Sequence, residues 1–586
     1  MQHSYSEFTP AYGALMERIV PLIESLYPQS DALELAQRLT AISAIDAQTV
    51  QLPVPHKSHW DQQDIMLITY GDSIISEGEK PLHTLKTMLD NNLQESVSMV
   101  HILPYYPYSS DGGFAVSDYE KINPQLGDWH DVTEISHGYR IMADLVVNHC
   151  SSEHPWFKAF IDGDSTYEDF FVQASPDEDL SAVVRPRTTP LLRHTITKNG
   201  DKYVWCTFSH DQIDLNFANP DVFIEVMRLI AMYIDYGASI FRLDAIGFLW
   251  KEIGTSCIHL PQTHQAIQLM RALIEYRLPT AIIITETNVP KKENLTYFGN
   301  ANEAHMVYNF SLPPLLINAM LSGSARHLKT WLMSMPPAQM GTTYLNFIAS
   351  HDGIGVRPAE GILDPEEIQN MIHSLQSFGA KVSWRAGLNG EKSPYEINIS
   401  LIDAFKGTHE GEDEYQVARM LCAHAIAIAL EGVPAIYIHS FLATENDYET
   451  LAKTEHNRDI NRKKWPLEEL QPLLDDPQSL HAQVLSGMKG LIELRKKQAA
   501  FHPNATQFTL HLDDGLFGFW RQSLMRNQSI FVVNNVTNQP QVLNLTQLNL
   551  IDMDEWKELI SGQMIEDLYG QITLAPYQTV WISNLW

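Results

Sequence analysis

Eight short apolar runs, separated by longer amphipathic stretches, constrain the fold of this chain most strongly. The stretches between the runs include FIEVMRLIAMYIDYG and HQAIQLMRALIEYR, whose apolar residues have helical spacing. Strands that alternate with crossover helices form parallel sheets, and eight such units indicate an α/β fold closed into a (β/α)8 barrel. The runs, rich in β-branched residues, lie at 65–70, 97–104, 140–149, 238–245, 281–287, 306–310, 342–352 and 433–438.

The segments outside these units predict further domains. The first 58 residues have helical spacing, two connections are too long for simple crossovers, and the last 82 or so alternate short strands with turns. We therefore expect an N-terminal helical extension (1–58), a barrel (59–150 and 220–504), a small inserted domain after the third strand (151–219), a loop or helical insertion after the seventh strand (353–432) and a C-terminal antiparallel β domain (505–586).

Charge and composition exclude several classes of function. The 71 acidic residues outnumber the 40 basic ones, so the chain would repel a nucleic-acid backbone. Neither an apolar run of membrane-spanning length nor a signal-peptide pattern is present, so we expect no membrane partner and a cytoplasmic protein. The sequence leaves a monomer and a homodimer both open.

Motif searches give no sign of a cofactor. No GxGxxG follows a strand and no GK[ST] loop occurs, so a nucleotide cofactor is not expected. The four cysteines are far apart and form no CxxC pair, so we expect buried apolar side chains rather than a zinc site.

Polar residues end several of the apolar runs, where barrel enzymes place their active sites. The third run ends in Asp144, Asn148 and His149, the fourth in Arg242 and Asp244, the fifth in Glu286 and the seventh in His351 and Asp352. Taken singly, an acidic residue in such a place is more often a helix N-cap or an ion-pair partner. The set, however, is what retaining glycoside chemistry requires.

The three carboxylates suit different roles in that chemistry. One must attack the anomeric carbon, another must protonate the leaving oxygen, and a third can stabilise positive charge on the sugar. Arg242 lies two residues before Asp244 on the same strand and can hold it ionised and oriented, which suits a nucleophile. Glu286 follows apolar residues and can keep its proton until it donates.

The motifs DLVVNH, FRLDA, ITET and ASHD, in this order and spacing, resemble the four motif regions of the α-amylase superfamily. The resemblance implies a barrel with a small domain after the third strand and a C-terminal β domain. It also implies that Asp244 is the nucleophile, Glu286 the general acid/base and Asp352 the transition-state stabiliser. Asn148 stands where many amylases help to hold calcium.

The stretches LPYYPYSSDGGFAVSDY, RLDAIGFLWKEIGTSC, SHDGIGV and DINRKK resemble the sucrose phosphorylase subfamily over most of residues 60–500. That resemblance implies that inorganic phosphate, a co-substrate, releases the glucosyl group, and that no metal is needed. The glucose-binding residues that it implies are Asp111 and Arg462 as hydroxyl clamps, His149 and His351 as assistants, Phe114 as an apolar platform, and Gln212.

Further residues bear on the acceptor. Arg185 and Arg187 in VVRPRT are either surface arginines or a site for an oxyanion, and the resemblance favours phosphate or an acidic acceptor. Tyr395 matches a tyrosine on a mobile loop of the subfamily. The chain departs from the strict sucrose enzymes, which carry Tyr at Phe248 and Asp-Leu-Tyr-Gln at 393–396, so fructose is not the expected acceptor.

The stretches ITETNVPKKENLTYFGNANEAHMVY and EKSPYEINIS, with the N-terminal extension, resemble the glucosylglycerate phosphorylase branch. The implied reaction is reversible phosphorolysis of 2-O-α-D-glucosyl-D-glycerate to α-D-glucose 1-phosphate and D-glycerate. Alternatives are a phosphorylase of sucrose, glucosylglycerol or sucrose 6'-phosphate, a hydrolase, and a sugar-binding barrel without activity.

Overall fold

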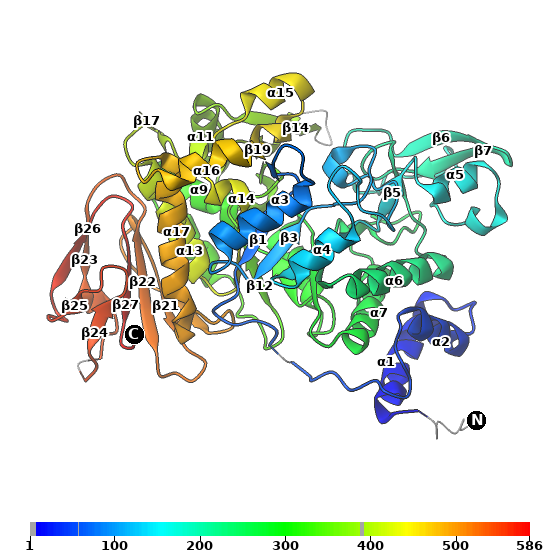
Figure 1. The fold of residues 1–586 in the computed structure, drawn as a ribbon, viewed down its shortest axis with the longest axis horizontal. Helices are drawn as coiled ribbons and strands as arrows, with labels where there is room; N and C mark the ends of the chain where they lie inside the picture. Colours follow the sequence, from blue (N-terminus) through cyan, green and yellow to red (C-terminus); the bar gives the residue numbers. More distant parts are fainter. Residues whose placement is uncertain (1–7, 57, 387–391, 552) are drawn as a thin grey trace. The chain divides into compact units, whose positions relative to one another are not determined.

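A computed structural model describes residues 8–56, 58–386, 392–551 and 553–586 (Figure 1). The predicted barrel is confirmed, because eight parallel strands close in the order β1-β18-β12-β11-β10-β9-β4-β3. Each predicted apolar run contains one of these strands, namely β1 (Met66–Thr69), β3 (Met99–Ile102), β4 (Arg140–Leu145), β9 (Ala238–Leu243), β10 (Ile282–Thr285), β11 (Met306–Tyr308), β12 (Thr343–Asn346) and β18 (Val433–Tyr437).

The chain divides into two compact units. The first consists of the chain up to His59, His101–Thr287 and Lys292–Val307, and the second of Trp60–Val100, Asn288–Lys291 and Tyr308–Trp586.

In the first unit, the N-terminal segment forms α1 (Pro10–Leu26) and α2 (Ala32–Ile42). Helix α1 packs against α7 (Pro261–Arg277) and α2 against α6 (Pro220–Asp235), as Figure 1 shows. The Asp31 carboxylate accepts from two backbone N–H groups at the start of α2, which fixes where that helix begins. The Arg18–Glu275 ion pair (3.0 Å) joins α1 to α7.

The third predicted run divides into two strands. Strand β4 stops at Leu145, and His149 begins a separate strand, β5 (His149–Ser151), which pairs antiparallel with β8 (Gln212–Asp214). The inserted segment supplies this partner, together with α5 (Pro155–Ile161) and the hairpin of β6 (Leu192–Thr197) and β7 (Gly200–Trp205). His149 is therefore placed by the insertion and not by the barrel strand.

In the second unit, the segment after β12 contains α11 (Pro365–Ser377), α13 (Gln416–Ala429) and a small sheet. The order of that sheet is β13 (Ile354–Gly355), β15 (Lys392–Asn398) and β14 (Lys381–Ala386). Helix α17 (Leu480–Lys496) packs against α13 and precedes the C-terminal domain.

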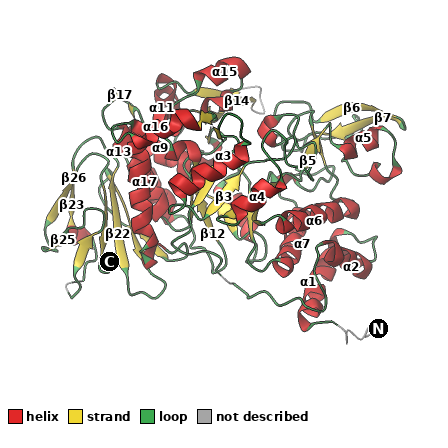
Figure 2. Cartoon of the chain, in the orientation of Figure 1, coloured by secondary structure: helices red, strands yellow, loops and turns green. Residues whose placement is uncertain are grey.

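The C-terminal strands form the antiparallel β domain expected, drawn in yellow in Figure 2. Its larger sheet has the order β20-β21-β22-β27-β24-β25, and β23 pairs with β26. The final segment divides into β26 (Gln571–Leu574) and β27 (Thr579–Ser583), and between them Tyr577 adopts a left-handed turn conformation (φ 56°). The other strands are β20 (Thr506–Thr509), β21 (Leu516–Gln522), β22 (Ser529–Asn535), β23 (Gln541–Asn544), β24 (Trp556–Glu558) and β25 (Met564–Ile565).

Two expectations from composition concern the whole chain. All four cysteines are buried, as predicted, and none of them forms a disulfide. None of the helices in the described part of the chain has the length and apolar character needed to span a bilayer.

Candidate active site

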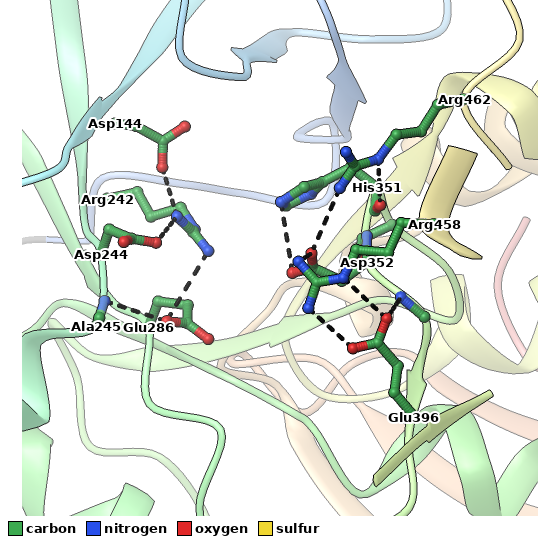
Figure 3. Close-up of polar contacts among 12 residues, drawn as sticks. Asp144, Arg242, Asp244, Ala245, Glu286, His351, Asp352, Glu396, Arg458 and Arg462 are labelled. Carbon is green, nitrogen blue, oxygen red and sulfur yellow. Dashed lines mark hydrogen bonds and ion pairs between the residues drawn. The ribbon is translucent and has the colours of Figure 1, made fainter. Parts of the chain in front are cut away.

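Three neighbouring barrel strands of the first unit carry a buried network of charges (Figure 3). Arg242, on β9, lies opposite Asp144 in the register of β4 and β9. Its Nη1 donates to Asp144 Oδ1 at 2.5 Å and to Asp244 Oδ1 at 2.6 Å. The other oxygen of Asp144 lies 2.6 Å from Nε2 of His101, on β3. The predicted orienting contact between Arg242 and Asp244 is thus present, but Arg242 also serves a second carboxylate.

The two aspartates that share Arg242 have pKa values shifted in opposite directions. Burial opposes ionisation of Asp144, but Arg242 and His101 outweigh it and lower the pKa of Asp144 below its ordinary value. Burial and the negative charge of Asp144 raise the pKa of Asp244, although Arg242 acts in the opposite direction. Arg242 therefore favours the ionised form of both aspartates, but at Asp244 burial and the charge of Asp144 outweigh it.

Glu286 joins the same network from the end of β10. The Ala245 backbone N–H donates to Glu286 Oε2 at 3.1 Å, and Arg242 Nη2 lies 4.0 Å from that oxygen. Ala245 holds its N–H there in a left-handed conformation (φ 49°), which costs a non-glycine residue energy and is frequent at functional sites. The structure thus brings Asp244 and Glu286 together around one arginine and one backbone amide.

Four predicted glucose-site residues form a second cluster in the first unit. Gln212 Nε2 donates to Asp111 Oδ2 at 3.0 Å and to the Phe114 carbonyl at 3.2 Å, and its Oε1 accepts from the Ser209 hydroxyl at 2.9 Å. The His149 ring nitrogen Nε2 lies 2.8 Å from the same Phe114 carbonyl. The Phe114 ring centroid is 5.6 Å from the Arg242 guanidinium, so this cluster adjoins the carboxylate network.

Sequence reasoning missed a buried lysine beside Asn148. The Lys251 ammonium lies 2.7 Å from both Asn148 Oδ1 and Asp214 Oδ2, and Thr207 also donates to Asp214. A lysine that follows an apolar run has no sequence signal of its own, since Asp214 is far away in the chain. Among the residues that the structure describes, no group of three or more His, Cys, Asp or Glu side chains is placed to hold a metal ion.

The remaining predicted glucose-site residues lie together in the second unit. His351 and Asp352 follow β12, which ends at Asn346 and not at Asp352 as the seventh run suggested. The Arg462 Nε donates to the His351 carbonyl at 2.8 Å, and its Nη2 lies 3.8 Å from Asp352 Oδ1. A closer partner, Arg458 Nη1, lies 2.6 Å from that oxygen and was not predicted.

The residues predicted for the acceptor side lie on three segments. Arg185 and Arg187 belong to the loop 184–190 of the inserted segment, where Arg185 is exposed and donates to the Thr189 carbonyl. Tyr395 lies on β15 and is half-buried. Phe248 packs edge to face against Phe208, whose ring also contacts His149. An apolar aromatic pair therefore stands where the resemblance expects a hydroxyl.

The chain is similar to known proteins over most of its length. The catalytic-domain model of the α-amylase family matches residues 93–356. Glucosylglycerate phosphorylase from Spirochaeta thermophila is 40% identical over 97% of this chain and 98% of its own length, and that from Escherichia coli is 39% identical over 97% and 100%. The crystal structure of sucrose 6F-phosphate phosphorylase from Thermoanaerobacter thermosaccharolyticum aligns with a TM-score of 0.70 at 25% identity and covers 81% of this chain and 94% of that one. The chain therefore belongs to the α-amylase family, in the branch that contains the glycoside phosphorylases.

Proposed function

We propose that this protein is a retaining glycoside phosphorylase that interconverts 2-O-α-D-glucosyl-D-glycerate plus phosphate and α-D-glucose 1-phosphate plus D-glycerate. The observation that carries the choice of glycerate is the near full-length similarity to proteins named glucosylglycerate phosphorylase. The contacts of Arg242 with Asp244 and Glu286 support the retaining chemistry, because a nucleophile and an acid/base must act on the same bond.

In the first step, the Asp244 carboxylate attacks the anomeric carbon and the bond from that carbon to the glycerate oxygen breaks. Glu286 gives its proton to the departing oxygen. In the second step, a phosphate oxygen attacks the anomeric carbon, the ester bond to Asp244 breaks, and Glu286 recovers a proton from phosphate. Two inversions give net retention, so α-linked substrate yields α-D-glucose 1-phosphate. Asp352 would stabilise the positive charge that develops on the sugar.

The other predicted residues receive roles in substrate binding. Asp111 and Arg462 would hold glucose hydroxyls, with Phe114 as the apolar platform and His149 and His351 beside them. The contacts of Gln212 suggest that it acts through Asp111, because its amide nitrogen donates to the Asp111 carboxylate. Arg185 and Arg187 would attract phosphate or the glycerate carboxylate, and Tyr395 would lie on the acceptor side. The reaction needs no cofactor and no metal, and the buried free cysteines suit a reducing cytoplasm.

Phosphate release from α-D-glucose 1-phosphate tests this proposal. The purified protein would be incubated with D-glycerate, glycerol, fructose, fructose 6-phosphate or water alone as acceptor. We expect rapid release with D-glycerate only, an α-linked product by NMR, and a loss of at least about 10⁴-fold in kcat for Asp244→Asn. Release without an added acceptor would identify a hydrolase, and a preference for fructose or glycerol would identify a different phosphorylase.

A further inference from the structure

The buried Glu396 and its partner Arg458 both contact the turn that carries Asp352. Arg458, in the short helix Asn457–Asn461, places its Nη1 2.6 Å from Asp352 Oδ1. The other edge of its guanidinium makes a bidentate pair with Glu396, with Nε 2.9 Å from Oε1 and Nη2 2.8 Å from Oε2 (Figure 3). Glu396 is only 5% exposed, and it reaches this pair from β15. One guanidinium thus joins two carboxylates from different segments.

Glu396 also holds the backbone directly after Asp352. The Gly353 N–H donates to Glu396 Oε1 at 2.8 Å. A Cβ built at Gly353 would lie 2.3 Å from Glu396 Cγ and 2.7 Å from Asn398 Oδ1, closer than real Cβ atoms approach. Glycine is therefore what lets β15 lie against this turn, and Glu396 contacts both the backbone of the turn and the arginine on its side chain.

The ion pair between Glu396 and Arg458 fixes an orientation and adds little to stability. A buried ion pair contributes little net stability, because the cost of desolvating both charges offsets their attraction. A bidentate arginine–carboxylate pair does fix the plane of the guanidinium, since two parallel hydrogen bonds define it. With its Nε and Nη2 edge fixed on Glu396, Arg458 presents Nη1 to Asp352 in a defined direction.

We propose that Glu396 and Arg458 are positioning residues for Asp352 in glucosyl transfer, and that they are not contacts for the acidic acceptor. Glu396 holds Arg458, and Arg458 orients the Asp352 carboxylate. The inference rests on the proposed function, in which Asp352 stabilises charge on the sugar. Because the glucosyl group is common to both half-reactions, loss of this positioning slows both of them alike.

Arsenolysis separates glucosyl transfer from acceptor binding. In arsenolysis, arsenate attacks the glucosyl enzyme in place of phosphate, and the glucose 1-arsenate that forms hydrolyses in water. The enzyme therefore consumes α-D-glucose 1-phosphate without any D-glycerate. For Glu396→Gln and Arg458→Gln we expect kcat to fall about 10- to 100-fold in both arsenolysis and D-glycerate glucosylation, with KM for D-glycerate changed less than about threefold. Arg458→Lys keeps the charge and should recover part of the rate.

A matched control lies nearby. Glu360 pairs with Arg385 of β14 at 2.8 Å, but both side chains are substantially exposed, so Glu360→Gln should leave every rate unchanged. Because Glu396 and Arg458 act as one unit, the double variant Glu396→Gln/Arg458→Gln should be no slower than the worse single variant. Thermal unfolding of each variant shows that it is folded at the assay temperature.

Two results would overturn the inference. A tenfold rise in KM for D-glycerate with unchanged arsenolysis would make Arg458 an acceptor contact, and unchanged rates in both assays would make the pair purely structural. If the wild-type protein performs arsenolysis but ignores D-glycerate, the acceptor in the proposed function is wrong. The arsenolysis rates of the variants still decide the positioning role in that case.

Discussion

Arg242 approaches Asp244 from two residues earlier in the chain, and its Nη1 lies 2.6 Å from Asp244 Oδ1 and 2.5 Å from Asp144 Oδ1. One nitrogen thus holds two carboxylates whose pKa values move in opposite directions, down for Asp144 and up for Asp244. A nucleophile must be ionised to attack, so the pKa of Asp244 sets the acidic limb of the pH profile in the proposed mechanism.

Asp144→Asn should move that acidic limb to lower pH. The substitution removes a negative charge that raises the pKa of Asp244 and leaves Asp244 as the one aspartate paired with Arg242, and both changes favour the ionised form. We expect the acidic limb of the pH profile of kcat/KM to shift down by about one pH unit, even if the maximal kcat/KM also changes. A limb that stays in place or moves up would show that Asp144 does not act on the nucleophile through its charge.

Gln212→Glu should weaken glucosyl binding through Asp111. The new carboxylate would face the Asp111 carboxylate across the present 3.0 Å contact, where an amide N–H now donates. We expect KM for α-D-glucose 1-phosphate to rise about 10- to 100-fold, with a smaller rise for Gln212→Ala, which removes the hydrogen bond without adding repulsion. An equal effect of the two substitutions would argue that Gln212 touches the sugar itself.

Ala245→Val should lower both kcat and thermal stability. A β-branched residue is strongly disfavoured at φ 49°, so the turn would shift and withdraw the N–H that Glu286 accepts at 3.1 Å. We expect kcat to fall about tenfold. Ala245→Gly tolerates this backbone conformation and should stay within about threefold of the wild-type rate, which distinguishes backbone strain from loss of the side chain.

Two buried histidines should make the protein sensitive to acid. Burial lowers the pKa of His424 to about 4 and that of His439 to about 3, whereas an unfolded histidine titrates near ~6.5. The unfolded chain takes up protons first, so stability is fully present above about pH 6.5 and falls as the pH drops below it. Between pH 7 and pH 5, each histidine should reduce the free energy of unfolding by about 2 kcal/mol.

Urea unfolding at both pH values checks this expectation. His424→Gln should lose less stability than the wild type over the same interval, because glutamine does not titrate. The exposed His130, changed to Gln, should leave the wild-type pH dependence intact. Equal pH dependence in wild type and His424→Gln would mean that His424 is protonated in the folded protein without a penalty.

Much of the barrel could be predicted from local pattern. A strand buried on both faces needs a continuous apolar run, and a crossover helix needs an apolar stripe, so the order of strands and helices is already present in the sequence. Strand ends were less predictable. Whether Leu145 or His149 ends the third run depends on β8, which pairs with His149–Ser151 from more than sixty residues further along the chain.

The sequence by itself determined the eight-fold alternation, the C-terminal β domain and the acidic and basic residues that end the barrel strands. Only the tertiary structure decided how those charges are shared. Three sets of contacts join distant segments of the chain. Arg242 pairs with Asp144 and Asp244, the Lys251 ammonium lies between Asn148 and Asp214, and Arg458 joins Glu396 to Asp352. A local pattern records which side chains are buried, but the strength and direction of a charge interaction depend on distances that only folding sets.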